Sequence, residues 1–182
     1  IDRAQLTLYT GNSGWLRGLA HSHVIETDAV HGAIRLTDPR PASTARLYFR
    51  PWDLVLDRPE SRRAAGVGFE SERSAADVAA TRARMLGPRG FHSNDHPFVT
   101  VDVSWADEHS AHITIRFRDR LAEQRVPLEF RVLDGRIDAR AEFVLGHEAL
   151  GIRPYSAFAG AIAVAETIRI SLVVSASRIP EV

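Results

Sequence analysis

Two histidines placed two residues apart have the spacing best suited to metal chemistry. On a β-strand, this spacing puts the imidazoles of His21 and His23 on the same side. Such a pair supplies two of the ligands that a zinc or copper ion takes in proteins. A third ligand would come from one of four other histidines, His31, His92, His96 or His147. Paired histidines are also common as hydrogen-bonded structural groups or exposed side chains, so both interpretations stay open.

Nucleophilic catalysis finds little support in the sequence. The chain contains no Cys, which excludes disulfides, cysteine-bound zinc and thiol catalysis. No Gly-x-Ser-x-Gly motif marks a serine nucleophile. Pro97 favours an extended backbone at His96, which is typical of a turn leading into a strand. No spacing singles out a pair of catalytic carboxylates, and we therefore predict that the protein is not an enzyme.

Short alternating runs predict the elements that must position these side chains. Ile168, Ile170, Leu172 and Val174 are apolar at every second position, as in a strand with one buried face. Similar runs recur from Gln5 to Ser175 and give eight or nine strands, a number suited to an all-β barrel or sandwich. Asp134-Gly135, between two such runs, predicts a tight hairpin.

One segment departs from the strand pattern. Ser74, followed by Asp77 three residues later, is typical of a helix N-terminus, and Gly87-Pro88 is typical of a helix end. We therefore expect one short helix near residues 74–86. The charged stretch from Arg58 to Glu72, which contains Pro59 and two glycines, is predicted to be a loop.

Composition restricts the partners. The 23 basic residues, all Arg, balance 23 acidic residues and are scattered, so we expect no nucleic-acid partner. No run approaches the roughly 18 apolar residues that a membrane-spanning helix needs, and we expect a chain that is not integral to a membrane. The length of 182 residues predicts one domain over residues 1–182, with enough core to surround a cavity.

Six sequence motifs in a particular order resemble those of the YceI-like family of lipocalin-like proteins. They are AHSHVIE at 20–26, HGAIRL at 31–36, MLGP at 85–88, DHPFVTV at 95–101, VPLEF at 126–130 and LGIRPYSAFAGAIAV at 150–164. The resemblance spans nearly the whole chain. Ala20 and Ser22 depart from it, because relatives usually have Gly and Asp there; so do the hairpin over 113–125 and the charged loop over 57–73.

This resemblance implies an extended eight-stranded antiparallel β-barrel that holds a polyisoprenoid or fatty-acyl chain. The predicted function is non-enzymatic lipid binding by a carrier or sequestering protein, with no cofactor apart from such a lipid. Eight strands enclose room for one slender ligand. The resemblance also implies a homodimer. It implies a periplasmic or secreted bacterial protein if a signal peptide precedes Ile1, and a cytoplasmic one if none does.

Apolar residues on the predicted strands are the candidates for the barrel lining, although the sequence does not fix which face points inward. They are Leu36, Leu47, Phe49, Phe98, Val101, Ile113, Phe130, Phe143, Phe158, Ile162, Ile168 and Leu172. Arg153, with the neighbouring Tyr155, is the first candidate for a charged head group at the barrel mouth, and His21 and His23 come next. The small residues between Ala157 and Ala165 favour an open tunnel.

Two further functions stay open at this stage. A metal- or haem-binding module would use His21 and His23. A barrel filled by its own side chains would instead act through its surface on a protein partner.

Overall fold

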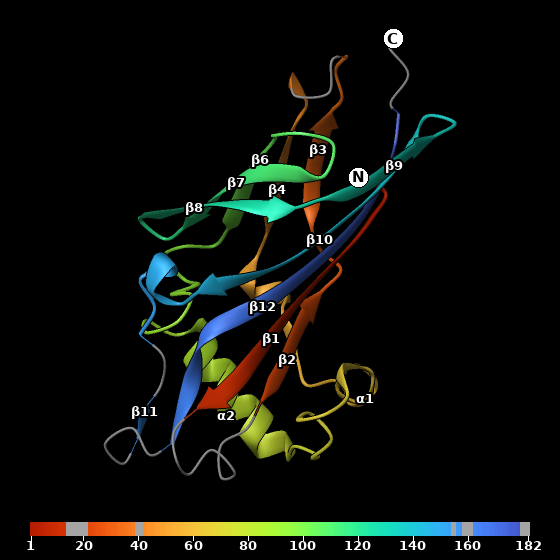
Figure 1. The fold of residues 1–182 in the computed structure, drawn as a ribbon. Helices are drawn as coiled ribbons and strands as arrows, with labels where there is room; N and C mark the ends of the chain where they lie inside the picture. Colours follow the sequence, from red (N-terminus) through yellow and green to blue (C-terminus); the bar gives the residue numbers. More distant parts are fainter. Residues whose placement is uncertain (14–21, 39–41, 154–155, 158–161, 179–182) are drawn as a thin grey trace.

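Two antiparallel β-sheets form the fold in the computed structural model, which describes residues 1–13, 22–38, 42–153, 156–157 and 162–178. The first sheet has the strand order β5-β2-β1-β12-β10-β9, and β11 pairs with β12 beside this path (Figure 1). Its strands are β1 (Arg3–Ser13), β2 (His23–Thr27), β5 (Val55–Leu56), β9 (Glu129–Leu133), β10 (Arg136–Gly146), β11 (Ser156–Ala157) and β12 (Ile162–Ser177).

The second sheet has five strands in the order β3-β4-β6-β7-β8. They are β3 (His31–Arg35), β4 (Thr44–Phe49), β6 (Val99–Trp105), β7 (Ser110–Phe117) and β8 (Arg120–Pro127). In β4, Ala45, Leu47 and Phe49 are buried and the residues between them are exposed. This alternation is the pattern from which the strands were predicted, and it turns one apolar face of the sheet toward the core.

The prediction of an eight-stranded closed barrel is wrong, although the all-β character is confirmed. The described residues form twelve strands in two sheets, and no backbone ladder joins the sheets into a barrel. β9 pairs only with Arg136–Arg140 of β10, and the remainder of β10 lies near β8, where Gln124 Nε2 donates a hydrogen bond to Val144 O at 3.2 Å. Alternation reveals that a segment is a strand, but it does not reveal where a sheet stops pairing.

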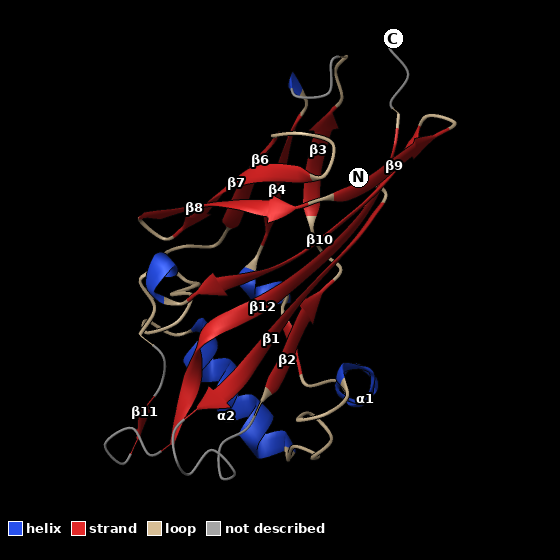
Figure 2. Ribbon diagram, in the orientation of Figure 1, coloured by secondary structure: helices blue, strands red, loops and turns tan. Residues whose placement is uncertain are grey.

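The predicted helix is confirmed as α2 (Ala75–Leu86). Ser74 caps it, because its Oγ accepts a hydrogen bond from Asp77 N at 3.1 Å. A second helix, α1 (Pro59–Ala65), lies within the stretch that was predicted to be a loop. Pro59 occupies the first turn, where a missing N–H costs nothing, and α1 packs against β2. The structure also describes two 3₁₀ turns, Pro51–Asp53 (η3) and Glu148–Leu150 (η4) (Figure 2).

The predicted hairpin at Asp134-Gly135 is also confirmed. It joins β9 to β10, and both residues have positive φ, at 49° and 76°. These values are those of a two-residue hairpin turn, in which Gly carries no steric penalty. α2 lies toward the end of the molecule opposite this hairpin (Figure 1). None of the described helices has the length and apolar character to cross a membrane.

Candidate ligand-binding cavity

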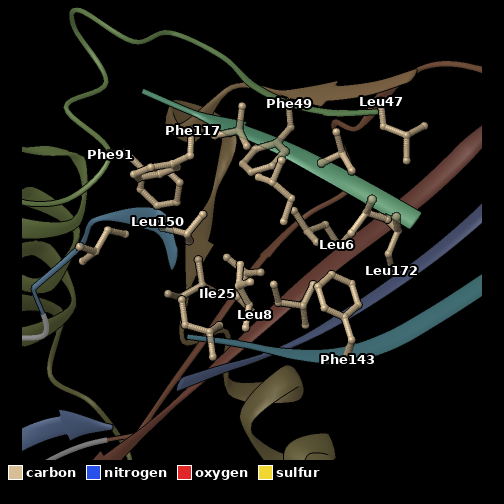
Figure 3. A pocket seen from close by; sticks show the side chains of 18 of the residues that line it. Leu6, Leu8, Ile25, Leu47, Phe49, Phe91, Phe117, Phe143, Leu150 and Leu172 are labelled. Carbon is tan, nitrogen blue, oxygen red and sulfur yellow. The ribbon is translucent and has the colours of Figure 1, made fainter. Parts of the chain in front are cut away.

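A cavity of about 1360 Å³ lies between the two sheets. Figure 3 shows Leu6 and Leu8 of β1 facing Leu47 and Phe49 of β4 across it. Its size exceeds the roughly 300–1,000 Å³ of most small-molecule sites. The cavity is therefore large enough for a ligand with a long chain.

The walls are apolar because each contributing strand turns alternate side chains inward. From the first sheet they are Leu6, Leu8, Ile25, Ala139, Ala141, Phe143, Leu145, Val164, Ile168, Ile170, Leu172 and Val174. From the second sheet and its connections they are Ile34, Ala45, Leu47, Phe49, Val99, Val101, Val103, Trp105, Ala111, Ile113, Ile115, Phe117, Val126 and Leu128.

Small side chains keep this space open. Ala45, Ala111, Ala139 and Ala141 lie among the large residues of the walls. The segment from Ala157 to Ala165, which is predicted to supply small lining residues, does not do so at the side chains that the structure describes. Val164 lines the cavity, whereas Ala163 and Ala165 are not among the lining residues, and 158–161 lie outside the described part of the chain.

One end of the cavity is formed by α2 and by two connections. The turn after α2 contributes Gly87 to Phe91, and η4 contributes Leu150 with the residues that follow it. The rings of Phe91 and Phe117 pack edge to face, with their centroids 5.4 Å apart. Leu150 lies near this pair (Figure 3). Arg89 and Arg153 also line the cavity and are exposed, so the cavity reaches solvent at this end.

Most of the residues predicted to contact a ligand lie in this lining. They are Leu47, Phe49, Val101, Ile113, Phe143, Ile168 and Leu172 on the walls, together with His23 and Arg153. Whether each of them contacts a ligand stays a prediction.

Three other candidates lie elsewhere. Phe98 is 49% exposed and packs edge to face on Tyr48 at 5.9 Å, on the outer side of the second sheet. It precedes β6, whose odd-numbered residues Val99 and Val101 point inward, so Phe98 has the opposite parity. Leu36 and Phe130 are partly buried and pack against the core, but they are not among the lining residues.

For four candidates, the structure does not describe the side chain. His21, Tyr155 and Phe158 lie outside the described residues. Ile162 is the first residue of β12, where its backbone pairs with Ala157, but its side chain is not described.

His23 takes part in a buried charged network at the edge of the cavity. Its Nδ1 lies 2.6 Å from Oδ2 of Asp57, a carboxylate with no exposed side-chain surface. Asp57 Oδ1 accepts hydrogen bonds from Val24 N at 3.0 Å and from Arg62 Nη1 at 2.6 Å. Arg62 Nη1 also donates to Ser22 O at 2.8 Å. The network links β2 to the start of α1.

The charge of Asp57 depends on these partners. Burial raises the pKa of the Asp57 carboxyl, but the hydrogen bonds from His23 and Val24 and the pairing with Arg62 outweigh burial and hold the pKa below its ordinary value. Asp57 is therefore ionised at neutral pH and accepts the proton on His23 Nδ1. Nε2 is then the ring nitrogen that does not contact Asp57.

His147 is a second histidine of the lining, and unlike His23 it is fully buried. It is 6% exposed, and its Nδ1 is buried without a hydrogen-bond partner among the described residues. Burial lowers the pKa of the His147 imidazole, and the backbone carbonyls of Glu166 and Ala165 offset part of this effect. His147 therefore adds a neutral polar group to the wall.

The histidines do not gather into a metal centre within the part of the chain that the structure describes. His31 stacks on Tyr48 with ring centroids 5.6 Å apart, and His92 Nε2 pairs with Asp95 Oδ2 at 3.0 Å. His96 lies beside His92. Each of these is separate from His23 and Asp57.

Several residues of the site were not among the sequence candidates. The sequence predicts a charged loop around Asp57 and Arg62, and nothing local in it shows that Asp57 joins both Arg62 and His23. Phe117 and Ile115 share the inward face of β7 with the predicted Ile113, so the alternation of that strand would have found them. Ala139 and Ala141 would have followed from Phe143 by the same parity.

Comparisons with solved structures identify the fold. BcnA from Burkholderia cenocepacia superimposes with a TM-score of 0.63 at 9% sequence identity, over 96% of this chain and 96% of BcnA. The YceI protein of Campylobacter jejuni superimposes with a TM-score of 0.57 at 7% identity, over 83% of this chain and 82% of that protein. No family model matches the sequence, and no curated sequence is significantly similar. The likeness confirms what the six motifs predicted: the chain has the fold of the YceI proteins.

Proposed function

We propose that the protein binds one long apolar lipid, a polyisoprenoid or a fatty-acyl chain, between its two sheets. It acts as a carrier or sequestering protein and does not transform the lipid. The observation that carries this proposal is the large cavity with its apolar walls. The shared fold with YceI proteins is consistent with it.

The energetics of burial favour such a ligand. Each methylene group moved from water into an apolar site contributes about 0.8 kcal/mol. A dozen buried groups therefore contribute about 10 kcal/mol before the costs of immobilising the ligand are subtracted. Useful affinity then requires no hydrogen bond from the walls. Selectivity for a particular lipid would come from cavity length and from the few polar groups.

The test is mass spectrometry of an organic extract from the natively purified protein, with a mock purification from cells that lack it. A prenyl or acyl species in about equimolar amount with the protein would support the proposal. A clean extract, together with no binding of added lipid by protein that circular dichroism shows to be folded, would contradict it. That result would favour a protein that acts through its surface on a partner.

A second candidate function is haem or metal binding through His23. Metal-bound histidines commonly donate their other ring N–H to a carboxylate, which is the relation between His23 and Asp57. Titration with haemin, followed by absorbance, tests this function. The expected result is a Soret band that His23→Ala removes and His31→Ala, on an exposed histidine, retains. Equal spectra for both variants would contradict a role of His23.

A further inference from the structure

Charge is distributed unevenly between the cavity and the rest of the chain. The sequence has equal numbers of basic and acidic residues. The described lining nevertheless contains five arginines and no Asp or Glu. They are Arg84, Arg89, Arg118, Arg140 and Arg153. Binding a hydrocarbon chain alone would not require this excess of positive charge in the lining.

Two of these arginines lie together at the solvent end of the cavity. Arg118, in the turn between β7 and β8, donates a hydrogen bond from Nη1 to Gly90 O at 3.3 Å. Arg89 precedes Gly90 in the turn that follows α2. The Phe91–Phe117 ring contact joins the same two turns. Arg89 and Arg118 therefore border one opening.

Arg153 reaches this opening from a third element. It lies two residues after Gly151, which follows η4 with a φ of 65°. A Cβ on Gly151 would lie 2.2 Å from Nε of Arg120, so the connection after η4 packs directly on the first residue of β8. Arg120 is two residues from Arg118. Three connections that are distant in sequence thus contribute Arg89, Arg118 and Arg153 to the lining at this end of the cavity.

Arg89, Arg118 and Arg153, which we call the rim arginines, differ from the arginines on the outer faces of the sheets. Outside, Arg46 pairs with Asp102, and Arg169 lies 3.0 Å from Glu142. No ion pair between described residues engages Arg89, Arg118 or Arg153, and Arg89 and Arg153 are exposed. Arg140 lines the cavity but pairs with Glu142 at 3.2 Å, so its charge is balanced.

We propose that Arg89, Arg118 and Arg153 form a binding site for the anionic head group of an amphiphile, a carboxylate or a phosphate, whose chain occupies the cavity. This inference rests on the proposed lipid-binding function and specifies the chemical class of the lipid. Guanidinium groups bind carboxylates and phosphates through paired N–H donors. The apolar walls hold the chain, and the rim fixes which end of the lipid remains at the surface.

The experiment compares two fluorescent ligands that share a chain, cis-parinaric acid and its methyl ester. Each is titrated into delipidated full-length protein, the triple variant Arg89→Gln/Arg118→Gln/Arg153→Gln, and the matched control Arg46→Gln, which lies outside the cavity. We expect the wild type and the control to bind the acid at least about tenfold more tightly than the ester, as charge-assisted hydrogen bonds would give. The triple variant should bind both ligands with the affinity of the ester. The double variant Arg89→Gln/Arg153→Gln, which changes only exposed side chains, should lose most of the preference.

The outcomes distinguish a failure of lipid binding from a failure of the head-group site. Failure of the wild type to bind either ligand would contradict lipid binding itself. Equal affinities for acid and ester, or a preference that survives in the triple variant, would overturn the head-group site alone. Inorganic phosphate tests whether the arginines bind a free anion instead. If it raised the melting temperature of the wild type as much as the acid does, the arginines would serve a free anion rather than a lipid.

Discussion

His23 and Asp57 are 34 residues apart in sequence, and Nδ1 of the first lies 2.6 Å from Oδ2 of the second. The contact connects a residue of the cavity lining with the segment that leads into α1. It fixes the ring of His23, because Asp57 has no exposed side-chain surface and is itself held by Val24 N and Arg62.

Asp57→Asn should destabilise the protein strongly. The substitution removes the negative charge that balances Arg62, whose Nε and Nη2 are buried without partners among the described residues. Breaking one side of a buried ion pair typically costs about 3–5 kcal/mol. Urea denaturation at pH 7 measures this loss. Asp53→Asn is the control, because Asp53 pairs with the exposed Arg50 and should cost less than about 1 kcal/mol. Similar losses for both variants would contradict the buried network.

The ionised carboxylate of Asp57 also predicts a loss of stability in acid. Because the folded-state pKa of Asp57 is below its ordinary value, the ionised carboxylate stabilises the fold above the unfolded-state pKa of about 3.9. This contribution is lost as the pH falls through the lower folded-state pKa. Free energies of unfolding from pH 7 to pH 2 should fall less steeply below pH 4 in Asp57→Asn than in the wild type. Parallel curves would assign the acid sensitivity to other carboxylates.

His147 predicts a separate pH effect in a milder range. Burial lowers the pKa of its imidazole in the folded protein, whereas the unfolded chain titrates near about 6.5. The unfolded state therefore binds the proton first as the pH falls below about 6.5, and stability decreases there. Between pH 7.5 and pH 5.5, His147→Phe should lose less stability than the wild type does. An unchanged difference would mean that the pKa of His147 is the same in the folded and unfolded states.

Ala141→Trp should block lipid binding without unfolding the protein. Ala141 lies on the cavity wall, where a large side chain would occupy ligand space. Val144→Trp places the same residue on the same strand, at a position that is 51% exposed. We expect at least about a tenfold weaker affinity for methyl parinarate in Ala141→Trp only, which is a loss of about 1.4 kcal/mol. Unchanged binding by Ala141→Trp would show that ligand does not reach this wall.

Phe117→Ala tests whether the aromatic end of the cavity supports the fold. Phe117 is 2% exposed and contacts Phe91, so truncation should cost about 3–5 kcal/mol. Leu121→Ala, on a side chain that is 56% exposed, should change stability by less than about 0.5 kcal/mol. Thermal and chemical denaturation distinguish these values. A small effect of Phe117→Ala would mean that the ring contributes little to packing.

The sequence predicted local features well because they depend on neighbouring residues. The helix at Ala75–Leu86 and the Asp134-Gly135 turn follow from capping and turn chemistry. α1 was missed because it is a seven-residue helix packed on β2, with Arg62 bound to Asp57 and Ser22. Short helices owe their stability to tertiary packing, which the local sequence does not display.

The candidate site shows the same division between local and distant information. Alternation found Leu47, Phe49 and Ile113. It also included Phe98, which precedes β6 and has the opposite parity to the inward-facing residues of that strand. The partners of His23 could not be predicted, since they join segments distant in the chain. The pairing of strands into two sheets rather than a closed barrel depends on the same long-range contacts.

The wall of the cavity is only weakly joined where β8 and β10 lie next to each other, and we call this contact the seam. Within the described residues no backbone ladder joins these strands, and Gln124 Nε2 bonds to Val144 O across them. Parting two fully paired strands would break a series of hydrogen bonds worth about 1 kcal/mol each, whereas this seam holds mainly through side chains. Val126 and Leu145 border it from inside. For the proposed lipid ligand, this predicts sideways entry between β8 and β10 rather than end-on entry, with a loading time that depends only weakly on chain length.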